Sequence, residues 1–234
     1  MGMFSKQELL HRAVIYADYL QGRKPRGLIL TFHGLNCVSV SPELQAEQLR
    51  WAQEGWLIVL PYCGPWSWMN RDTRDYIDRL LDAVYEAYAL PQDLPLVFYG
   101  WSMGGYAAML YATYTRRSVE RLILKYPVCD LKAHYSERPD VPISMQAAFW
   151  GYDESTLWQE QNPMERIHLL PKVPYLFFHS ADDTKVSKRI HSDVMVAALR
   201  QRGYDVTYLE ATGYEHHAPL LEEDVQKISA FINA

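Results

Sequence analysis

The chain lacks a cysteine framework and a long apolar run, and each absence argues against a class of protein. Its three cysteines lie far apart, without CxxC or metal-type spacing, at Cys37, Cys63 and Cys129. Such a sparse, odd set argues against a disulfide framework and favours a reducing compartment. No apolar run is long enough to cross a bilayer, and charges interrupt the segment from Met1 to Leu20, so it is not typical of a signal peptide. We therefore expect a cytoplasmic protein that does not bind membranes.

Clustered charge and cofactor motifs are absent as well. The net charge is only -5, and no run of Lys or Arg offers the surface that nucleic-acid binding requires. No glycine-rich loop of the phosphate-binding kind is present, and Glu215-His216-His217 lacks the four-residue spacing of helical zinc ligands. We expect no nucleic-acid partner, no cofactor and no metal.

The composition is that of one compact domain with alternating strands and helices. Of 234 residues, 49% are apolar and 22% are charged, which suits a single domain over residues 1–234. Apolar runs bounded by turn residues predict strands at 14–20, 28–32, 56–60, 96–99, 122–126, 175–178 and 206–209. Helices are predicted from Ser41-Pro42 to about 54 and at 72–90, 103–113, 186–201 and 220–232. This alternation predicts an α/β fold with a mostly parallel central sheet and helices on both faces.

One segment, 131–172, interrupts the alternation. It shows no clear strand, but carries several prolines and aromatic residues. A connection of this length is typical of a lid or a binding loop. We predict a small helical lid or cap over residues 131–172, with an irregular packing segment as the alternative.

The strongest chemical signal is Gly100-Trp101-Ser102-Met103-Gly104, between a predicted strand and a predicted helix. A serine on such a turn projects its hydroxyl above the sheet, and the flanking glycines let strand and helix approach. The N-terminus of the following helix points at the place where negative charge would develop. We predict Ser102 as a nucleophile, against the alternative of a capping serine in a glycine-rich turn.

A serine nucleophile needs a histidine base and an acid that orients it, and both have two adjacent candidates. His216 and His217 follow the last predicted strand, whereas Asp182 and Asp183 follow the strand before it. Each pair lies where a parallel sheet places its site, at the carboxyl end of a strand. The chain order of serine, acid and histidine is the order expected for this scaffold.

With these motifs the chain resembles the α/β-hydrolase superfamily, and within it small serine esterases similar to prolyl oligopeptidases and dienelactone hydrolases. The acid loop of these esterases reads His-Gly-x-x-Asp-x-x-Val, and residues 179–186 match it with Ser180 in place of glycine. Their histidine loop, Gly-x-x-His, matches residues 213–216. The resemblance therefore selects Asp183 and His216, with Asp182 bracing the loop and His217 as a neighbour.

The same resemblance implies an oxyanion hole. Phe32-His33-Gly34-Leu35 is similar to the family's His-Gly motif, so the backbone N–H groups of Leu35 and Met103 would hold the oxyanion. His33 would then hold the loop by hydrogen bonds rather than act as a base. We expect Trp68, Trp101 and Trp150 to wall an apolar or aromatic substrate pocket, with core packing as the equal alternative. The loop after Pro61 lacks the Asp-x-Arg-Gly motif common in relatives, so their substrates are a weak guide.

These residues predict an enzyme, a serine hydrolase that cleaves a small carboxylic ester through an acyl-enzyme. A peptidase or a thioesterase is the second hypothesis, although the large peptidases of this resemblance carry a propeller domain that these 234 residues lack. An inactive hydrolase fold that binds a ligand is the third. A small-molecule ester is the expected partner. The sequence does not reveal the oligomeric state, and a homodimer is compatible with it.

Overall fold

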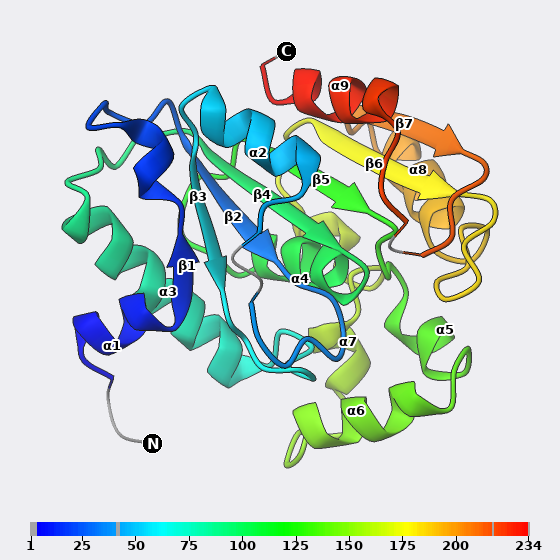
Figure 1. Ribbon diagram of the computed structural model, residues 1–234. Helices are drawn as coiled ribbons and strands as arrows, with labels where there is room; N and C mark the ends of the chain where they lie inside the picture. The colour runs from blue at the N-terminus through cyan, green and yellow to red at the C-terminus, as the bar shows by residue number, and fades with distance from the viewer. Residues whose placement is uncertain (1–3, 41–42, 217, 234) are drawn as a thin grey trace.

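The computed structural model of the protein describes residues 4–40, 43–216 and 218–233, and these residues form one seven-stranded sheet (Figure 1). The strands lie in the order β1-β3-β2-β4-β5-β6-β7, and only the edge strand β1 is antiparallel to its neighbour. Their bounds are β1 Ala13–Ile15, β2 Leu28–Phe32, β3 Leu57–Pro61, β4 Leu96–Trp101, β5 Arg121–Lys125, β6 Tyr175–Ser180 and β7 Val206–Ala211. The predicted mostly parallel sheet is confirmed.

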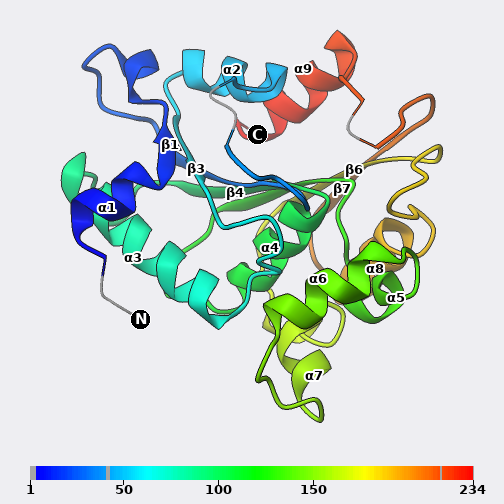
Figure 2. The ribbon, with the colours of Figure 1, turned by 60° about the horizontal axis from the view of Figure 1, so that its bottom comes forward.

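Helices cover both faces of this sheet. Figure 2 shows α2 (Ala46–Gln53) and α9 (Glu222–Phe231) on one face, and α3 (Arg71–Ala87), α4 (Met103–Ala112) and α8 (Ser192–Gln201) on the other. The short helix α1 (Lys6–His11) packs against α3. Because both faces are covered, the inner strands are largely apolar, and all five residues of β2 are buried.

The strands divide their side chains between two cores. Leu28, Leu30 and Phe32 of β2 join the larger core with α3, α4 and α8, whereas Ile29 joins the smaller core with α2 and α9. This follows from the two-residue period of a strand, which sends successive side chains to opposite faces. The helix α4 lies wholly inside, since all ten of its residues are buried.

Two local predictions are wrong at their boundaries. The strand predicted at 14–20 ends at Ile15, and Ala17–Leu20 forms a 3-10 turn, η1, that buries Leu20. The helix predicted from 186 begins only at Ser192, because Glu137 holds the Ser187 N–H and the His191 ring in the loop before it. The predicted start at Ser41-Pro42 lies outside the described residues, and α2 begins at Ala46 after the cap residue Gln45.

The segment 131–172 is helical and holds no strand. It forms α5 (Leu131–Tyr135), α6 (Asp140–Ala148), α7 (Leu157–Gln161) and the 3-10 turn η2 (Ile167–Leu169). Leu131, Val141 and Met145 are buried in the larger core, so the segment is packed onto the domain. It follows the carboxyl end of β5 and lies below that edge of the sheet in Figure 1. Its action as a lid stays a prediction.

Among the described residues, no helix is both long enough and apolar enough to span a membrane.

Candidate active site

Ser102 occupies a strained turn between β4 and α4. Its backbone has φ 57° and ψ -124°, a conformation that residues other than glycine rarely adopt. The Ser102 N–H donates to the Lys125 carbonyl on β5 at 3.0 Å, and its carbonyl accepts from the N–H groups of Gly105 and Tyr106. Backbone contacts to β5 and α4 thus hold the turn in this conformation.

The glycines around Ser102 are required by close backbone contacts. A Cβ atom on Gly100 would lie 2.2 Å from the Gly104 carbonyl oxygen, so strand and helix touch there. A Cβ atom on Gly104 would lie 2.0 Å from the Phe32 carbonyl oxygen, at the end of β2. Gly105, which the sequence analysis did not single out, would meet Pro127 at 2.6 Å. The three glycines let α4 begin directly against the edge of the sheet.

The structure brings Ser102, His216 and Asp183 into one hydrogen-bonded chain. The Ser102 Oγ lies 2.9 Å from His216 Nε2, and His216 Nδ1 lies 2.7 Å from Asp183 Oδ2. Since Nδ1 faces a carboxylate oxygen, it carries the ring proton, which leaves Nε2 to accept from the serine hydroxyl. All three side chains are largely buried.

Asp183 is held as a charged carboxylate. Its Oδ1 accepts from the backbone N–H groups of Lys185 (2.8 Å) and Val186 (3.0 Å). Burial raises the pKa of the Asp183 carboxyl, but hydrogen bonds from His179 and His216 outweigh burial and hold that pKa well below its usual range. The group therefore stays ionised where His216 needs a negative partner.

His179 is a neighbour of the site for which the sequence motif alone indicated no role. It is fully buried, and its Nε2 lies 3.2 Å from Asp183 Oδ2 and 3.0 Å from the Val186 carbonyl oxygen. Two acceptors around Nε2 mean that this nitrogen carries a proton and donates. The other ring nitrogen, Nδ1, lies 2.7 Å from Ser192 Oγ. His179 begins the acid-loop motif, which was the signal that could have found it.

Polar contacts join the acid loop to the histidine loop. The Asp182 carboxylate accepts from the Gly213 N–H at 2.5 Å, and the Ser180 hydroxyl accepts from the N–H groups of Asp182 (3.2 Å) and Tyr214 (3.3 Å). Asp182 therefore braces the loop through the Gly213 N–H. His217 lies outside the described residues.

Of the two predicted oxyanion-hole residues, Met103 begins α4 and Leu35 lies in the loop that follows β2, and their role stays a prediction. Met103 is the first residue of α4, so its N–H has no partner within the helix. The loop before Leu35 is held by His33, whose Nδ1 donates to the Gly34 carbonyl (3.0 Å) while its Nε2 accepts from the Cys63 N–H (3.1 Å). Burial lowers the pKa of His33. With both ring nitrogens engaged, His33 holds the loop, as expected.

The three tryptophans predicted as pocket walls lie in different surroundings. Trp68 is fully buried and donates to the Ser144 hydroxyl at 3.0 Å, so it does not face an open pocket; here the expectation is wrong, because the side chain packs under the inserted helices. Trp101 is half-buried beside Ser102 and packs on the smaller core. Trp150 is 89% exposed in the turn that follows α6. A pocket role for Trp101 and Trp150 stays a prediction.

A buried ion pair lies beneath the Ser102 turn. The Lys125 ammonium pairs with the Glu47 carboxylate, and Tyr99 donates to the same carboxylate. Burial raises the pKa of Glu47, but the Lys125 charge and the hydrogen bonds from Lys125 and Tyr99 together outweigh burial and lower that pKa. Because the Lys125 carbonyl also accepts from the Ser102 N–H, the pair fixes the strand end on which the turn rests.

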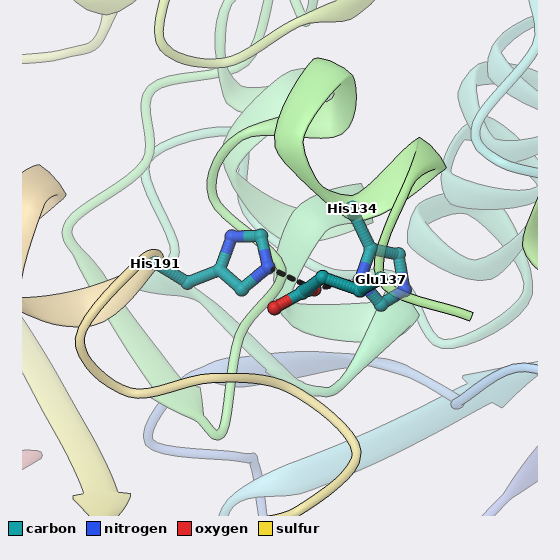
Figure 3. A group of neighbouring side chains, drawn as sticks. All are labelled: His134, Glu137 and His191. Carbon is teal, nitrogen blue, oxygen red and sulfur yellow. Dashed lines mark hydrogen bonds and ion pairs between the residues drawn. The ribbon is translucent and has the colours of Figure 1, made fainter.

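One cluster in the described part of the chain has donor atoms that could be taken for a metal site: His134, Glu137 and His191 (Figure 3). Glu137 Oε2 lies 2.6 Å from His134 Nδ1 and 2.7 Å from His191 Nε2. However, His191 Nδ1 accepts from the N–H groups of Cys129 and Asp130, at 3.3 and 3.2 Å. The proton of a neutral His191 is therefore on Nε2, the atom that would have to bind the metal.

A hydrogen-bonded carboxylate explains this cluster better than a metal does. A metal-bound histidine normally donates its second N–H to an acceptor, and here that nitrogen faces two donors. Burial raises the pKa of Glu137, but the hydrogen bonds from His134 and His191 outweigh it and hold that pKa well below its usual range. Glu137 also accepts from the Ser187 N–H at 3.3 Å. It thus fastens the inserted helices to the loop that follows Asp183.

The fold and the serine turn place the chain in the α/β-hydrolase superfamily. Within that superfamily the chain belongs to the prolyl oligopeptidase family, whose sequence pattern matches residues 67–233. No curated protein sequence is significantly similar to this chain. Family and fold together support a serine hydrolase.

Solved structures share the fold at low sequence identity. An acylaminoacyl peptidase of Pyrococcus horikoshii is 16% identical with a TM-score of 0.73, over 91% of this chain and 37% of its own. A puromycin-hydrolyzing peptidase of Mycobacterium tuberculosis is 18% identical with a TM-score of 0.69, over 91% of this chain and 33% of its own. Esterase B of Lactobacillus rhamnosis is 13% identical with a TM-score of 0.72, over 96% of this chain and 85% of its own. The chain thus spans about a third of each peptidase and most of the esterase.

Proposed function

We propose that this protein hydrolyses a small carboxylic ester through an acyl-enzyme, with Ser102 as nucleophile, His216 as base and then acid, and Asp183 as the group that orients His216. The observation that carries the proposal is the chain of contacts from Ser102 Oγ to His216 Nε2 (2.9 Å) and from His216 Nδ1 to Asp183 Oδ2 (2.7 Å). A serine hydroxyl is a weak nucleophile until a base at this distance takes its proton.

In the acylation step, Ser102 Oγ bonds to the ester carbonyl carbon as its proton moves to His216 Nε2. The carbonyl π electrons move onto oxygen, and the N–H groups of Leu35 and Met103 stabilise this oxyanion. The intermediate collapses, the bond to the leaving oxygen breaks, and that oxygen takes the proton from Nε2. Water then gives a proton to Nε2 and attacks the acyl carbon, which releases the acid and returns the proton to Ser102.

We place an ester before a peptide because Esterase B shares the fold and because the oxygen of an ester leaves more readily than the nitrogen of an amide, so an ester demands less of the serine and its base. The second candidate is a peptidase or a thioesterase, and the family match and the peptidase folds favour the peptidase. We further propose that residues 131–172 act as a lid beside Ser102, because they are fastened to the loop after Asp183 through Glu137.

A fluorophosphonate probe tests the nucleophile. We expect the wild-type protein to label and Ser102→Ala to lose labelling while its circular dichroism and thermal midpoint stay near wild type. The exposed Ser136→Ala variant, on the inserted segment, is the matched control and should label normally. A folded wild-type protein that does not label would contradict the proposal and favour an inactive binding fold.

A substrate panel tests the bond that is cleaved. We expect turnover of p-nitrophenyl esters of increasing acyl length, with an aryl ester such as a feruloyl ester included to probe the acyl pocket. Turnover of proline-anilide peptides without turnover of the esters would place the peptidase first.

A further inference from the structure

A cavity of about 800 Å³ lies within the inserted helices. Its lining falls between Tyr135 and Trp158, so it is formed by α5, α6, α7 and the turns between them, and Ser102, Asp183 and His216 do not line it. A volume of several hundred Å³ is that of a small-molecule site. The cavity is therefore large enough for a ligand of its own.

The walls of this cavity are largely aromatic, and tertiary contacts hold four of the five rings in place. Five rings line it: Tyr135, Phe149, Trp150, Tyr152 and Trp158. Tyr135 and Trp158 meet edge to face at 6.1 Å, and Phe149 and Tyr152 do so at 5.4 Å. The Tyr152 hydroxyl accepts from the Arg71 N–H at 2.5 Å, which ties the wall to the start of α3. Rings held in this way need little ordering when a ligand binds.

The charge of the cavity lining favours a positively charged ligand. Among the described residues, Glu154 is the one charged side chain in this lining. Arg71 stacks on the Tyr152 ring at 4.4 Å, but it does not line the cavity and its charge is paired with Glu160 at 2.7 Å. Aromatic faces carry negative potential, so rings and carboxylate together attract a cation with an apolar body.

We propose that this cavity is a binding site, separate from Ser102, for an organic cation of the arylammonium class. The ammonium lies against the aromatic faces near Glu154, and the aryl group packs among the rings, with Trp150 as the exposed wall. Binding at this site does not require catalysis at Ser102, so the proposal can be tested separately from the proposed ester hydrolysis.

Titration of the full chain with phenyltrimethylammonium tests this, with tert-butylbenzene as the neutral isostere and benzenesulfonate as the anion. Tryptophan fluorescence and calorimetry follow the binding. We expect saturable binding of the cation that is at least about fivefold tighter than binding of the isostere, with no binding of the anion. Trp150→Ala and Glu154→Gln should each weaken binding of the cation by about fivefold. Both residues are exposed, so these variants should fold.

Matched controls separate the site from general effects. Ile143→Ala removes an exposed apolar side chain of α6 outside the cavity lining, and Asp93→Asn removes one negative charge elsewhere; both should bind like wild type. Ser102→Ala and fluorophosphonate-treated protein should also bind like wild type. Equal affinity for cation and isostere, no saturable binding, or loss of binding when Ser102 is blocked would each overturn the proposal.

Discussion

Gly104, in the first turn of α4, lies so close to the end of β2 that a Cβ atom on it would stand 2.0 Å from the Phe32 carbonyl oxygen. The atoms that it would meet are backbone, of Phe32 and His33, and cannot turn aside as a side chain can. The proposed oxyanion-hole residue Leu35 lies two residues further along the chain. One glycine therefore sets the spacing between the serine turn and the loop of the proposed oxyanion hole.

Gly104→Ala should separate these two segments. We expect kcat for an ester to fall by about a hundredfold, because a shift of about 1 Å in a catalytic group has an effect of this size. Stability should fall by about 1–3 kcal/mol, as in other overpacked sites. Ester kinetics and urea unfolding measure the two effects. Gly203→Ala, at φ 72° with open space around it, is the control for backbone strain alone and should keep wild-type kinetics.

The Asp183→Asn and Asp182→Asn variants should differ sharply in kcat. Asp183 holds His216 at 2.7 Å, so an amide there favours the wrong tautomer and should lower kcat by about 10⁴. Asp182 braces the loop through the Gly213 N–H, so its loss should lower kcat by less than about tenfold. Similar losses in both variants would contradict the assignment of Asp183 as the triad acid.

The low pKa of Asp183 predicts a pH dependence of stability. Its folded pKa lies below the ordinary value of 3.8, so the unfolded chain binds the proton more readily and the stabilising contribution is lost as pH falls through the folded pKa. The difference in unfolding free energy between wild type and Asp183→Asn should shrink as pH falls from about 4 towards 2. Urea unfolding at a series of pH values measures it, and a constant difference below about pH 4 would refute the prediction.

The buried pair of Lys125 and Glu47 should show strong energetic coupling. Lys125→Met or Glu47→Leu alone leaves one charge buried without its partner, and each should cost about 3–5 kcal/mol of stability. The double variant should lose clearly less than the sum of the two, because neither charge remains. A double-mutant cycle by urea unfolding measures the coupling, and additive losses would show that the pair does not interact.

The cluster of His134, Glu137 and His191 should behave as a hydrogen-bonded group that needs no metal. Glu137→Leu leaves two buried histidine N–H groups without an acceptor and should cost about 2–4 kcal/mol, more than Glu137→Gln, which keeps an acceptor. Zinc or EDTA should leave the thermal midpoint of wild type unchanged. A rise in the midpoint with zinc that is lost in Glu137→Gln would instead show a metal site.

Local patterns predicted most of the sheet. Strand β2 was predicted with the bounds that the structure shows, since five consecutive apolar or β-branched residues suit a strand buried on both faces. The prediction at 14–20 failed because β1 is a short edge strand whose continuation folds back as η1. The start of α8 was placed too early because residues before it are held by Glu137, more than forty residues away in sequence.

Some features of the candidate site were likewise predicted from local sequence, and others were not. The resemblance selected Asp183 and His216 from their neighbours through loop motifs, and the structure places both within hydrogen-bond distance of each other. The contacts that the sequence did not reveal join distant segments, such as Lys125 with Glu47 and Glu137 with His191. No spacing in one sequence indicates such pairs, because their geometry depends on how strands and helices pack.

By itself, the sequence determined the local chemistry: a serine between two glycines on a strand-to-helix turn, and the later order of an acid loop and a histidine loop. These features depend on residues near one another in the chain, where sterics and hydrogen bonding act over a few residues. Only the tertiary structure decided which side chains face solvent. Trp68 is fully buried and Trp150 is 89% exposed, although both are tryptophans that the sequence predicted as pocket walls. Burial depends on contacts between segments far apart in sequence, so residue type alone could not distinguish them.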